Sequence, residues 1–163
     1  MMHPEAERLI IALDLQSHPE GGWYRETWRS GTMVEAPGGD RPAGTSILYL
    51  LADDAVSRFH RLTSDEVWYL HAGGPVHVRS LGDGGVETVT LDAGAAEPVF
   101  QVVVPGGTWF GAELAASAGY ALLGCAVAPG FRFEDFEMGM RSDLIHRFPA
   151  CTETIVRLTS GEV

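Results

Sequence analysis

His60 and Glu66 are the residues of this sequence best placed to do chemistry on a small molecule. His60 lies near the end of the run 56–62, and Glu66 begins the next run after the turn 63–65. A hairpin at this turn would bring the two side chains together, and strand residues of one parity share a face. An imidazole with a pKa of about 6.5 can remove a proton at neutral pH, with a carboxylate orienting it. The same pair can also contribute to a divalent metal site.

Short strands separated by turns are predicted around this pair. The predicted strands are residues 23–30, 45–51, 56–62, 66–72, 76–82, 86–91, 100–105, 108–114, 119–127 and 131–138. Strands this short and regular are typical of a β-sandwich or barrel. Helical periodicity occurs only at the two ends, after Pro4 and from residue 142 onward, where Ser142 is a candidate N-cap. The Gly- and Pro-rich segment 36–44 is predicted to be a flexible hairpin tip.

Composition and charge exclude several classes of function. The chain of 163 residues has the size of one domain, so residues 1–163 are assigned to a single domain. A formal charge of -11 argues against a nucleic-acid partner. Apolar stretches are far shorter than the roughly 20 residues that span a bilayer, and the first residues lack a signal-peptide pattern. A cytoplasmic protein without membrane contact is expected, with Cys125 and Cys151 as free thiols.

The run 60–73 resembles the first motif of the cupin superfamily, whose members fold into a double-stranded β-helix, or jelly-roll barrel. That motif contains two histidines, a glutamate and a glycine, and His60, Glu66 and Gly73 match three of these positions. Leu62 stands where the second histidine is found. The resemblance implies an all-β cupin barrel with short N- and C-terminal helices.

The run 102–110 resembles the second cupin motif, with its proline and glycine in place and Phe110 where the third histidine is found. A metal site needs three or four converging nitrogen or oxygen donors. His77 could add a donor to His60 and Glu66, and these three are the candidate ligands if a divalent metal binds. No other cofactor is expected.

Several longer blocks resemble an uncharacterised cupin subfamily described as predicted sugar epimerases (cupin family 5). These blocks span nearly the whole chain and are residues 18–30, 57–73, 102–112, 124–139 and 141–149. The resemblance implies a pocket for a small-molecule ligand. It also implies a homodimer formed by pairing of barrel edges, which would protect an exposed edge strand.

Epimerases of this barrel need a base beside a carbonyl and an acid on the opposite face of the substrate. The resemblance makes His60 the base, with Glu66 as its partner. Three tyrosines are candidates for the acid: Tyr120, Tyr69 and Tyr49. Spacing does not separate them, and Tyr120 is taken as the working assignment.

Arginines near these blocks are candidates for binding a charged group of the substrate, and they are Arg25, Arg58 and Arg61. Arg58 has the parity of the histidine and is predicted to point into the barrel, where its planar donors could bind a carboxylate, a phosphate or sugar hydroxyls. An ion pair of Arg58 with Glu26 or Glu66 is the alternative. Arg25 could bind ligand or lie in a subunit interface.

Aromatic side chains are predicted to line the pocket. Trp68 has the parity of the glutamate, and Trp109 follows a tight Pro-Gly-Gly turn. Phe110 and His77 complete the set of predicted ligand-binding residues. The acidic stretch 133–139 is interpreted as a solvated strand face without a catalytic role.

The leading hypothesis is a metal-independent sugar epimerase or isomerase with His60 as base. Two alternatives stay open, since one fold supports many functions. One is a non-catalytic protein that binds a small ligand in the same pocket. The other is a metal-dependent cupin with an incomplete ligand set.

Overall fold

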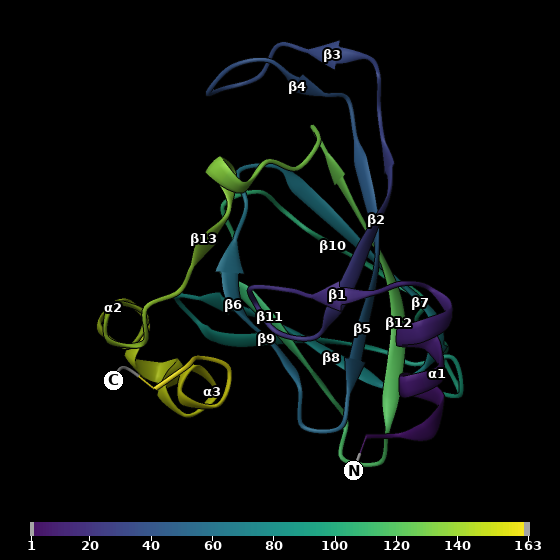
Figure 1. Ribbon diagram of the computed structural model, residues 1–163. Coiled ribbons are helices and arrows are strands. Elements are labelled where there is room, and N and C mark those ends of the chain that lie inside the picture. Colours follow the sequence, from purple (N-terminus) through teal and green to yellow (C-terminus); the bar gives the residue numbers. More distant parts are fainter. Residues whose placement is uncertain (1, 162–163) are drawn as a thin grey trace.

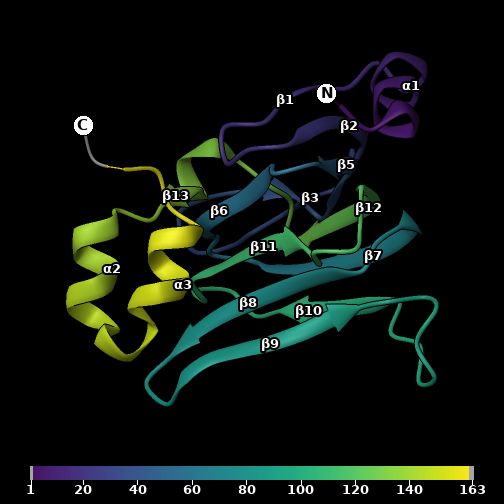
Figure 2. The same ribbon diagram turned by 90° about the horizontal axis from the view of Figure 1, so that it is seen from below.

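Two β-sheets face each other in the computed structural model, which describes residues 2–161 (Figure 1, Figure 2). The larger sheet contains, in spatial order, β1 (Gln16–Ser17), β2 (Trp23–Arg29), β5 (Thr45–Ala52), β12 (Tyr120–Ala128), β7 (Asp65–Gly73) and β10 (Gln101–Val104). The smaller sheet contains β13 (Glu137–Met138), β6 (Val56–Arg61), β11 (Phe110–Leu114), β8 (Val76–Gly82) and β9 (Gly85–Leu91). A two-stranded arm, β3 (Met33–Val34) and β4 (Arg41–Pro42), extends beyond the barrel at the top of Figure 1.

The space between the two sheets holds the main hydrophobic core. Alternate side chains of each strand point inward, which is the period of a half-buried strand. Tyr49, Leu51, Trp68 and Leu123 are among the buried side chains that meet there. The predicted all-β jelly roll is confirmed.

Short helices cover the outside of the barrel. α1 (Pro4–Ala12) packs Leu9 against Leu50 on the outer face of the larger sheet. The helices predicted at both ends of the chain are confirmed. No helix within residues 2–161 is both long enough and apolar enough to cross a membrane.

The C-terminal helices cover the smaller sheet. α2 (Arg141–Arg147) and α3 (Thr152–Arg157) are joined by the 3-10 turn η2 (Pro149–Cys151), and they pack in a cluster that includes Phe59 of β6. α2 begins one residue before Ser142, and its N-cap is Met140. The predicted N-cap at Ser142 is therefore wrong, because Ser142 already lies in the first helical turn.

The strand predicted over residues 131–138 is also wrong. Most of this segment is loop with the 3-10 turn η1 (Phe133–Asp135), and only Glu137–Met138 pairs with β6. Asp135 is held by an ion pair with Arg41 of the arm at 2.8 Å, and Arg41 is almost fully buried. Because a buried charge needs its partner, this pair fixes the segment in a conformation that a strand could not adopt.

A β-bulge in β6 decides which of its side chains face the barrel interior. Phe110 pairs with His60 and Ala112 pairs with Ser57, so three steps along β6 oppose two steps along β11. One extra residue reverses the parity of a strand. As a result Ser57 and His60 both face inward, and Arg58 does not follow the simple alternation.

Two glycines allow the loop before β2 to lie against the bulge in β6. The backbone N–H of Arg58 donates to the carbonyl oxygen of Glu20 at 2.8 Å. Gly21 has φ of +113°, and Gly22 has φ of +68°. A Cβ atom on Gly21 would overlap the carbonyl oxygen of Val56. Only glycine permits this approach, which directs the Glu20 side chain into the barrel.

Replacing Gly21 by alanine is expected to lower the free energy of unfolding by about 2 kcal/mol or more, from backbone strain and steric overlap together. Urea unfolding monitored by fluorescence measures this loss. Gly31→Ala is the matched control, because a Cβ atom there meets nothing within 4 Å. Equal unfolding midpoints for the two variants would contradict the role given to Gly21.

Candidate functional site

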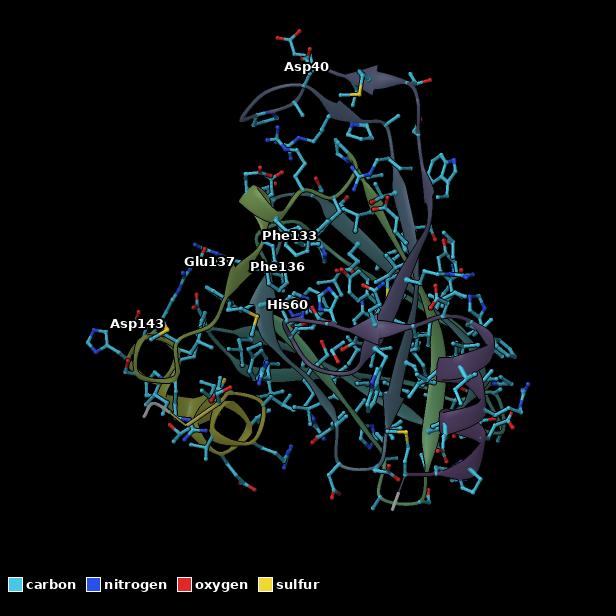
Figure 3. All side chains as sticks on the ribbon, in the orientation of Figure 1. Asp40, His60, Phe133, Phe136, Glu137 and Asp143 are labelled. Carbon is cyan, nitrogen blue, oxygen red and sulfur yellow. The ribbon has the colours of Figure 1, made fainter. Side chains whose placement is uncertain are left out.

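A cavity of about 290 Å³ opens between the larger sheet and the segment 131–136. In Figure 3, His60 and Phe136 lie close together beneath Phe133 in the middle of the molecule. Most of the titratable groups on the cavity wall come from β2, β6, β7 and the loop before β2. The lining residues are His18, Glu20, Tyr24, Glu26, Arg29, Thr45, Ile47, His60, Leu62, Glu66, Cys125, Val127, Phe131, Phe133 and Phe136.

His60 is buried and held at both ring nitrogens. Nδ1 lies 2.7 Å from the carbonyl oxygen of Arg58, and Nε2 lies 3.2 Å from Oε2 of Glu20. A carbonyl oxygen only accepts, so Nδ1 carries a proton. The distance between Nε2 and Glu20 Oε2 allows an ion pair when the imidazole is protonated. The two residues therefore form a pair of adjacent titratable groups on the cavity wall.

Glu20 completes this pair, although the sequence analysis did not select it. Its carboxylate is 5 % exposed, and Oε1 accepts a hydrogen bond of 2.8 Å from the Ser57 hydroxyl. Ser57 and His60 can both reach it because the β6 bulge turns both inward. The sequence signal was the His-Pro-Glu-Gly-Gly run, where two titratable residues precede a pair of glycines. That run enters the prediction only as the start of the block 18–30, which resembles the cupin subfamily.

His18 lies beside Glu20 and His60. Its Nδ1 atom accepts a hydrogen bond, whereas Nδ1 of His60 donates one. The backbone N–H of Glu20 donates to His18 Nδ1 at 3.2 Å, so this nitrogen carries no proton. The 3.5 Å approach of the same nitrogen to the Glu20 carboxylate is consequently not an ion pair. Burial lowers the pKa of His18, which outweighs the opposing effect of Glu20. His18 is therefore neutral at pH 7.

Glu66 supplies a second, chemically different carboxyl group. It is buried, and burial, reinforced by the negative charge of Glu20, raises its pKa to about 8. Glu66 is therefore mostly protonated at pH 7. Its Oε2 atom has no hydrogen-bond partner, and the neighbouring Trp68 Nε1 has none either. Burial also raises the pKa of the Cys125 thiol, which keeps that group neutral.

Aromatic rings form the wall opposite the sheet. The rings of Phe131, Phe133 and Phe136 contact one another edge to face, with centroids between 5.0 and 6.3 Å apart. Phe136 also lies 5.4 Å from the ring of His60. These rings come from the segment we had interpreted as a solvated acidic face. Its acids do point away, but its aromatic side chains cover the cavity.

Several predicted residues lie outside the cavity. The Arg58 guanidinium binds Ser160 and the carbonyl oxygen of Pro19, so the prediction that it points into the barrel is wrong because of the bulge. Arg25 is exposed on β2, between the cavity-lining Tyr24 and Glu26, and so faces the other way. Neither arginine can bind a ligand held in the cavity.

The aromatic residues predicted to line the pocket also lie outside the cavity. Trp109 packs in the cluster under the C-terminal helices, with the Arg61 guanidinium 4.7 Å from its ring centroid, so it does not wall the cavity. Trp68 and Phe110 are core residues behind the cavity, and the Phe110 ring lies 4.3 Å from that of His60. Phe110 thus supports His60 by packing and does not line the space.

The tyrosines proposed as acids are also elsewhere. Tyr120 packs against the α1 side of the larger sheet, where its ring stacks on His3. Tyr69 is partly exposed and does not line the cavity. Tyr49 is buried in the core and donates to the carbonyl oxygen of Gly21 at 2.7 Å. None of the three lines the cavity, whereas Glu66 and Tyr24 do.

The donor set does not fit a cupin metal ion. His77 hydrogen-bonds Thr90 on β9 at 2.8 Å and does not line the cavity. Leu62 lines it without offering a donor. The ring nitrogens of His60 are engaged by Arg58 and Glu20, as described above. Across residues 2–161, no group of three His, Cys, Asp or Glu side chains is arranged to hold a metal.

The fold and this cavity define a cupin-type barrel with a pocket lined by titratable side chains. A family model described as Cupin superfamily (DUF985) matches residues 7–139. The chain belongs to this family. It is 36 % identical over 146 residues to the Uncharacterized protein YML079W of Saccharomyces cerevisiae, covering 79 % of this chain and 72 % of the yeast protein.

Solved structures agree with this assignment. A hypothetical protein from Leishmania major is 34 % identical with a TM-score of 0.86, covering 94 % of this chain and 98 % of its own. Protein SO0799 from Shewanella oneidensis is 37 % identical with a TM-score of 0.88, covering 96 % of this chain and 98 % of its own. Oxalate decarboxylase from Bacillus subtilis, at 17 % identity and a TM-score of 0.55, matches 92 % of this chain and 38 % of its own length. That last likeness concerns the fold alone.

Proposed function

We propose that this cupin catalyses proton transfer at a carbon beside the carbonyl group of a small molecule, as an isomerase or epimerase does. The observation that carries the proposal is the contact between His60 Nε2 and Glu20 Oε2 at 3.2 Å on the cavity wall. Groups this close can hold one proton between them, and the Glu20 carboxylate keeps lone pairs that can accept a proton from the substrate and return it. The protonated Glu66 in the same cavity supplies the acid.

The reaction needs only groups of this chain. The C–H bond beside the carbonyl breaks, its proton moves to the Glu20–His60 pair, and the electron pair moves to the carbonyl oxygen. Glu66 stabilises the developing negative charge by donating a hydrogen bond from its carboxyl group, a role for which a neutral acid is required. Return of the proton to a carbon completes an isomerisation or epimerisation.

The surroundings of the pair support this assignment. The Ser57 hydroxyl and the Arg58 carbonyl hold the carboxylate and the imidazole in fixed orientations. Glu20 and His60 are themselves buried, at 5 % and 2 % exposure. A dry and preorganised site strengthens both the hydrogen bond to an oxyanion and the coupling within the pair.

Deuterium uptake from D₂O tests the proposal. A panel of short and six-carbon keto- and aldo-sugars, each with its phosphorylated form, is incubated with the protein and followed by proton NMR. The protein is expected to introduce deuterium beside the carbonyl of at least one compound, and His60→Ala is expected to abolish this. Tyr120→Phe is the matched control and keeps the activity, because Tyr120 lies on the α1 side. Compounds that bind without any exchange would instead favour a non-catalytic binding protein.

We also propose that the chain forms a homodimer through the edge of the larger sheet. β10 is the last strand of that sheet, and Phe100 and Val103 beside its free edge are both more than half exposed. Edge strands with apolar side chains favour pairing with a second copy. Light scattering is expected to give twice 17.6 kDa, and Val103→Lys is expected to lower the mass toward the monomer. A monomeric mass of the unaltered protein would contradict the dimer.

A further inference from the structure

The charges around the cavity cancel group by group. Arg29 is the one cationic side chain that lines the cavity within residues 2–161. Its Nε and Nη2 atoms bind the two oxygens of Glu26 at 2.9 and 2.7 Å, and its Nη1 binds the carbonyl oxygen of Phe131 at 3.1 Å. Three of the five N–H groups of the guanidinium are therefore engaged, and the side chain is 42 % exposed. An anionic ligand would have to share this guanidinium with Glu26.

The other titratable groups of the lining add no net charge at pH 7. Glu20 and His60, as an ion pair, are together neutral. Glu66 is mostly protonated, and His18 and Cys125 are both uncharged. A charged ligand would lose its hydration without finding an opposite charge, which is costly in a buried site.

The arginines closest to the aromatic wall are also matched. Arg41 Nη1 pairs with Asp135 at 2.8 Å, and Arg132 Nε pairs with the same carboxylate at 3.3 Å. The other guanidinium nitrogen contacts of Arg132 are the carbonyl oxygens of Gly38 and Asp40. These side chains hold the arm to the segment 131–136, and they leave no cluster of cations that could bind a diphosphate.

The Glu66 carboxyl group indicates what the ligand offers instead. Its side chain lines the cavity, while its Oε2 atom is enclosed beside Trp68 and Cys125 without a hydrogen bond of good geometry. A protonated carboxyl group can both donate and accept a hydrogen bond, as a hydroxyl group can. A ligand hydroxyl or carbonyl oxygen would therefore satisfy it without any change of charge.

From this balance of charges, the Glu66 carboxyl group on the cavity wall and the cavity volume, we infer that the substrate is an uncharged hydroxy-carbonyl compound no larger than a monosaccharide. Sugar phosphates and nucleotide-linked sugars are expected to bind less well, because the Arg29 guanidinium in the lining is shared with Glu26. The volume of about 290 Å³ lies at the lower limit of the roughly 300 to 1,000 Å³ of pockets for drug-sized ligands. This inference rests on the proposed function only in calling the ligand a substrate, because the observations behind it concern binding and not catalysis.

Binding of dihydroxyacetone and of dihydroxyacetone phosphate tests the inference, with D-fructose and D-fructose 6-phosphate as a second pair. The ring signals of His60 and His18 in ¹⁵N-correlated NMR spectra report on occupancy of the cavity. At least one uncharged compound is expected to shift these signals to saturation, and its phosphate ester is expected to leave them unchanged at the same concentration and ionic strength. Tighter binding of the esters, or no saturable shift with any of the four compounds, would overturn the inference.

A charge variant sharpens the test. Glu26→Gln removes the partner of Arg29, so this variant is expected to gain a saturable response to dihydroxyacetone phosphate. Glu87→Gln changes the net charge equally but lies exposed on β9, and it is expected to gain none. Identical responses of the two variants would also overturn the inference.

The outcomes separate this inference from the proposed function. Binding of dihydroxyacetone without deuterium uptake in any compound refutes catalysis and leaves the ligand class standing. Deuterium uptake into a phosphate ester refutes the ligand class and leaves the acid–base function standing.

Discussion

Glu20→Gln is expected to lower the rate of deuterium uptake by about 100-fold or more, the range in which general acid–base groups contribute. Glutamine keeps the shape of the side chain and can still accept the Ser57 hydrogen bond. Its amide cannot take up a proton at neutral pH, so the contact with His60 no longer carries a shared proton. Binding of the uncharged ligand is expected to change far less than the rate, because the cavity keeps its volume and lining.

Rates and affinities measured on the same samples decide this prediction. Deuterium uptake gives the rate, and the saturation of the His60 ring shifts gives the affinity. Glu87→Gln serves as the control for the change in net charge, because it is exposed on β9. A Glu20→Gln variant with the rate of the unaltered protein would show that the pair does not move the substrate proton.

Glu66→Gln is expected to stabilise the protein increasingly as the pH rises. The folded-state pKa of Glu66 is about 8, above its ordinary value, because burial penalises the charged form. Between the ordinary value and about 8 the folded protein holds a proton that the unfolded chain has released. Stability therefore falls with rising pH through this window, by at most about 1.4 kcal/mol per pH unit from this group. Glutamine has no such proton to lose.

Urea unfolding across this range measures the effect as a difference between the variant and the unaltered protein. The difference is expected to grow from about pH 5 and to level off above about pH 8. His18 and the other titrating groups are present in both proteins, so they contribute little to the difference. Glu87→Gln, whose carboxylate is exposed, is expected to show no such trend. Parallel stability curves for the Glu66 variant would mean that Glu66 is ionised in the folded protein.

The regular parts of the fold could be predicted because their residues repeat with a fixed period. The segments predicted as strands 45–51 and 119–127 alternate or run apolar between clear turns, and β5 (Thr45–Ala52) and β12 (Tyr120–Ala128) agree with them to within one residue. His60 and Glu66 lie on successive strands of such a pattern. Both line one cavity as the hairpin argument implied, although the two strands belong to different sheets.

The remainder of the site depends on irregular backbone segments, whose residues do not repeat with a fixed period. The bulge in β6 reverses the side chain of Arg58, and simple parity cannot anticipate an inserted residue. Glu20 reaches the cavity from a loop whose path depends on two glycines and on contacts with β6. Phe136 lies in a segment whose conformation is set by the Arg41–Asp135 pair, formed between residues 94 positions apart. Long-range contacts of this kind are not visible in local sequence.

The corrections also change which chemistry the pocket supports. The sequence suggested a histidine base with a tyrosine acid and arginines for a charged group of the substrate. In the structure a mostly protonated carboxyl group lies in the cavity, and the histidine proposed as base is paired with a second carboxylate. The single lining arginine is already bound to Glu26. The pocket is consequently suited to an uncharged ligand.

The protonation state of the His60 ring tests the central claim most directly, because it needs no ligand. In a ¹⁵N-labelled sample at neutral pH, Nδ1 is expected to give the signal of a protonated nitrogen that donates to the Arg58 carbonyl. Nε2 is expected to change its signal in Glu20→Gln, because its proton-sharing partner is lost. An unprotonated Nδ1, or an Nε2 signal that the Glu20 variant leaves unchanged, would contradict the shared-proton pair and the acid–base function built on it.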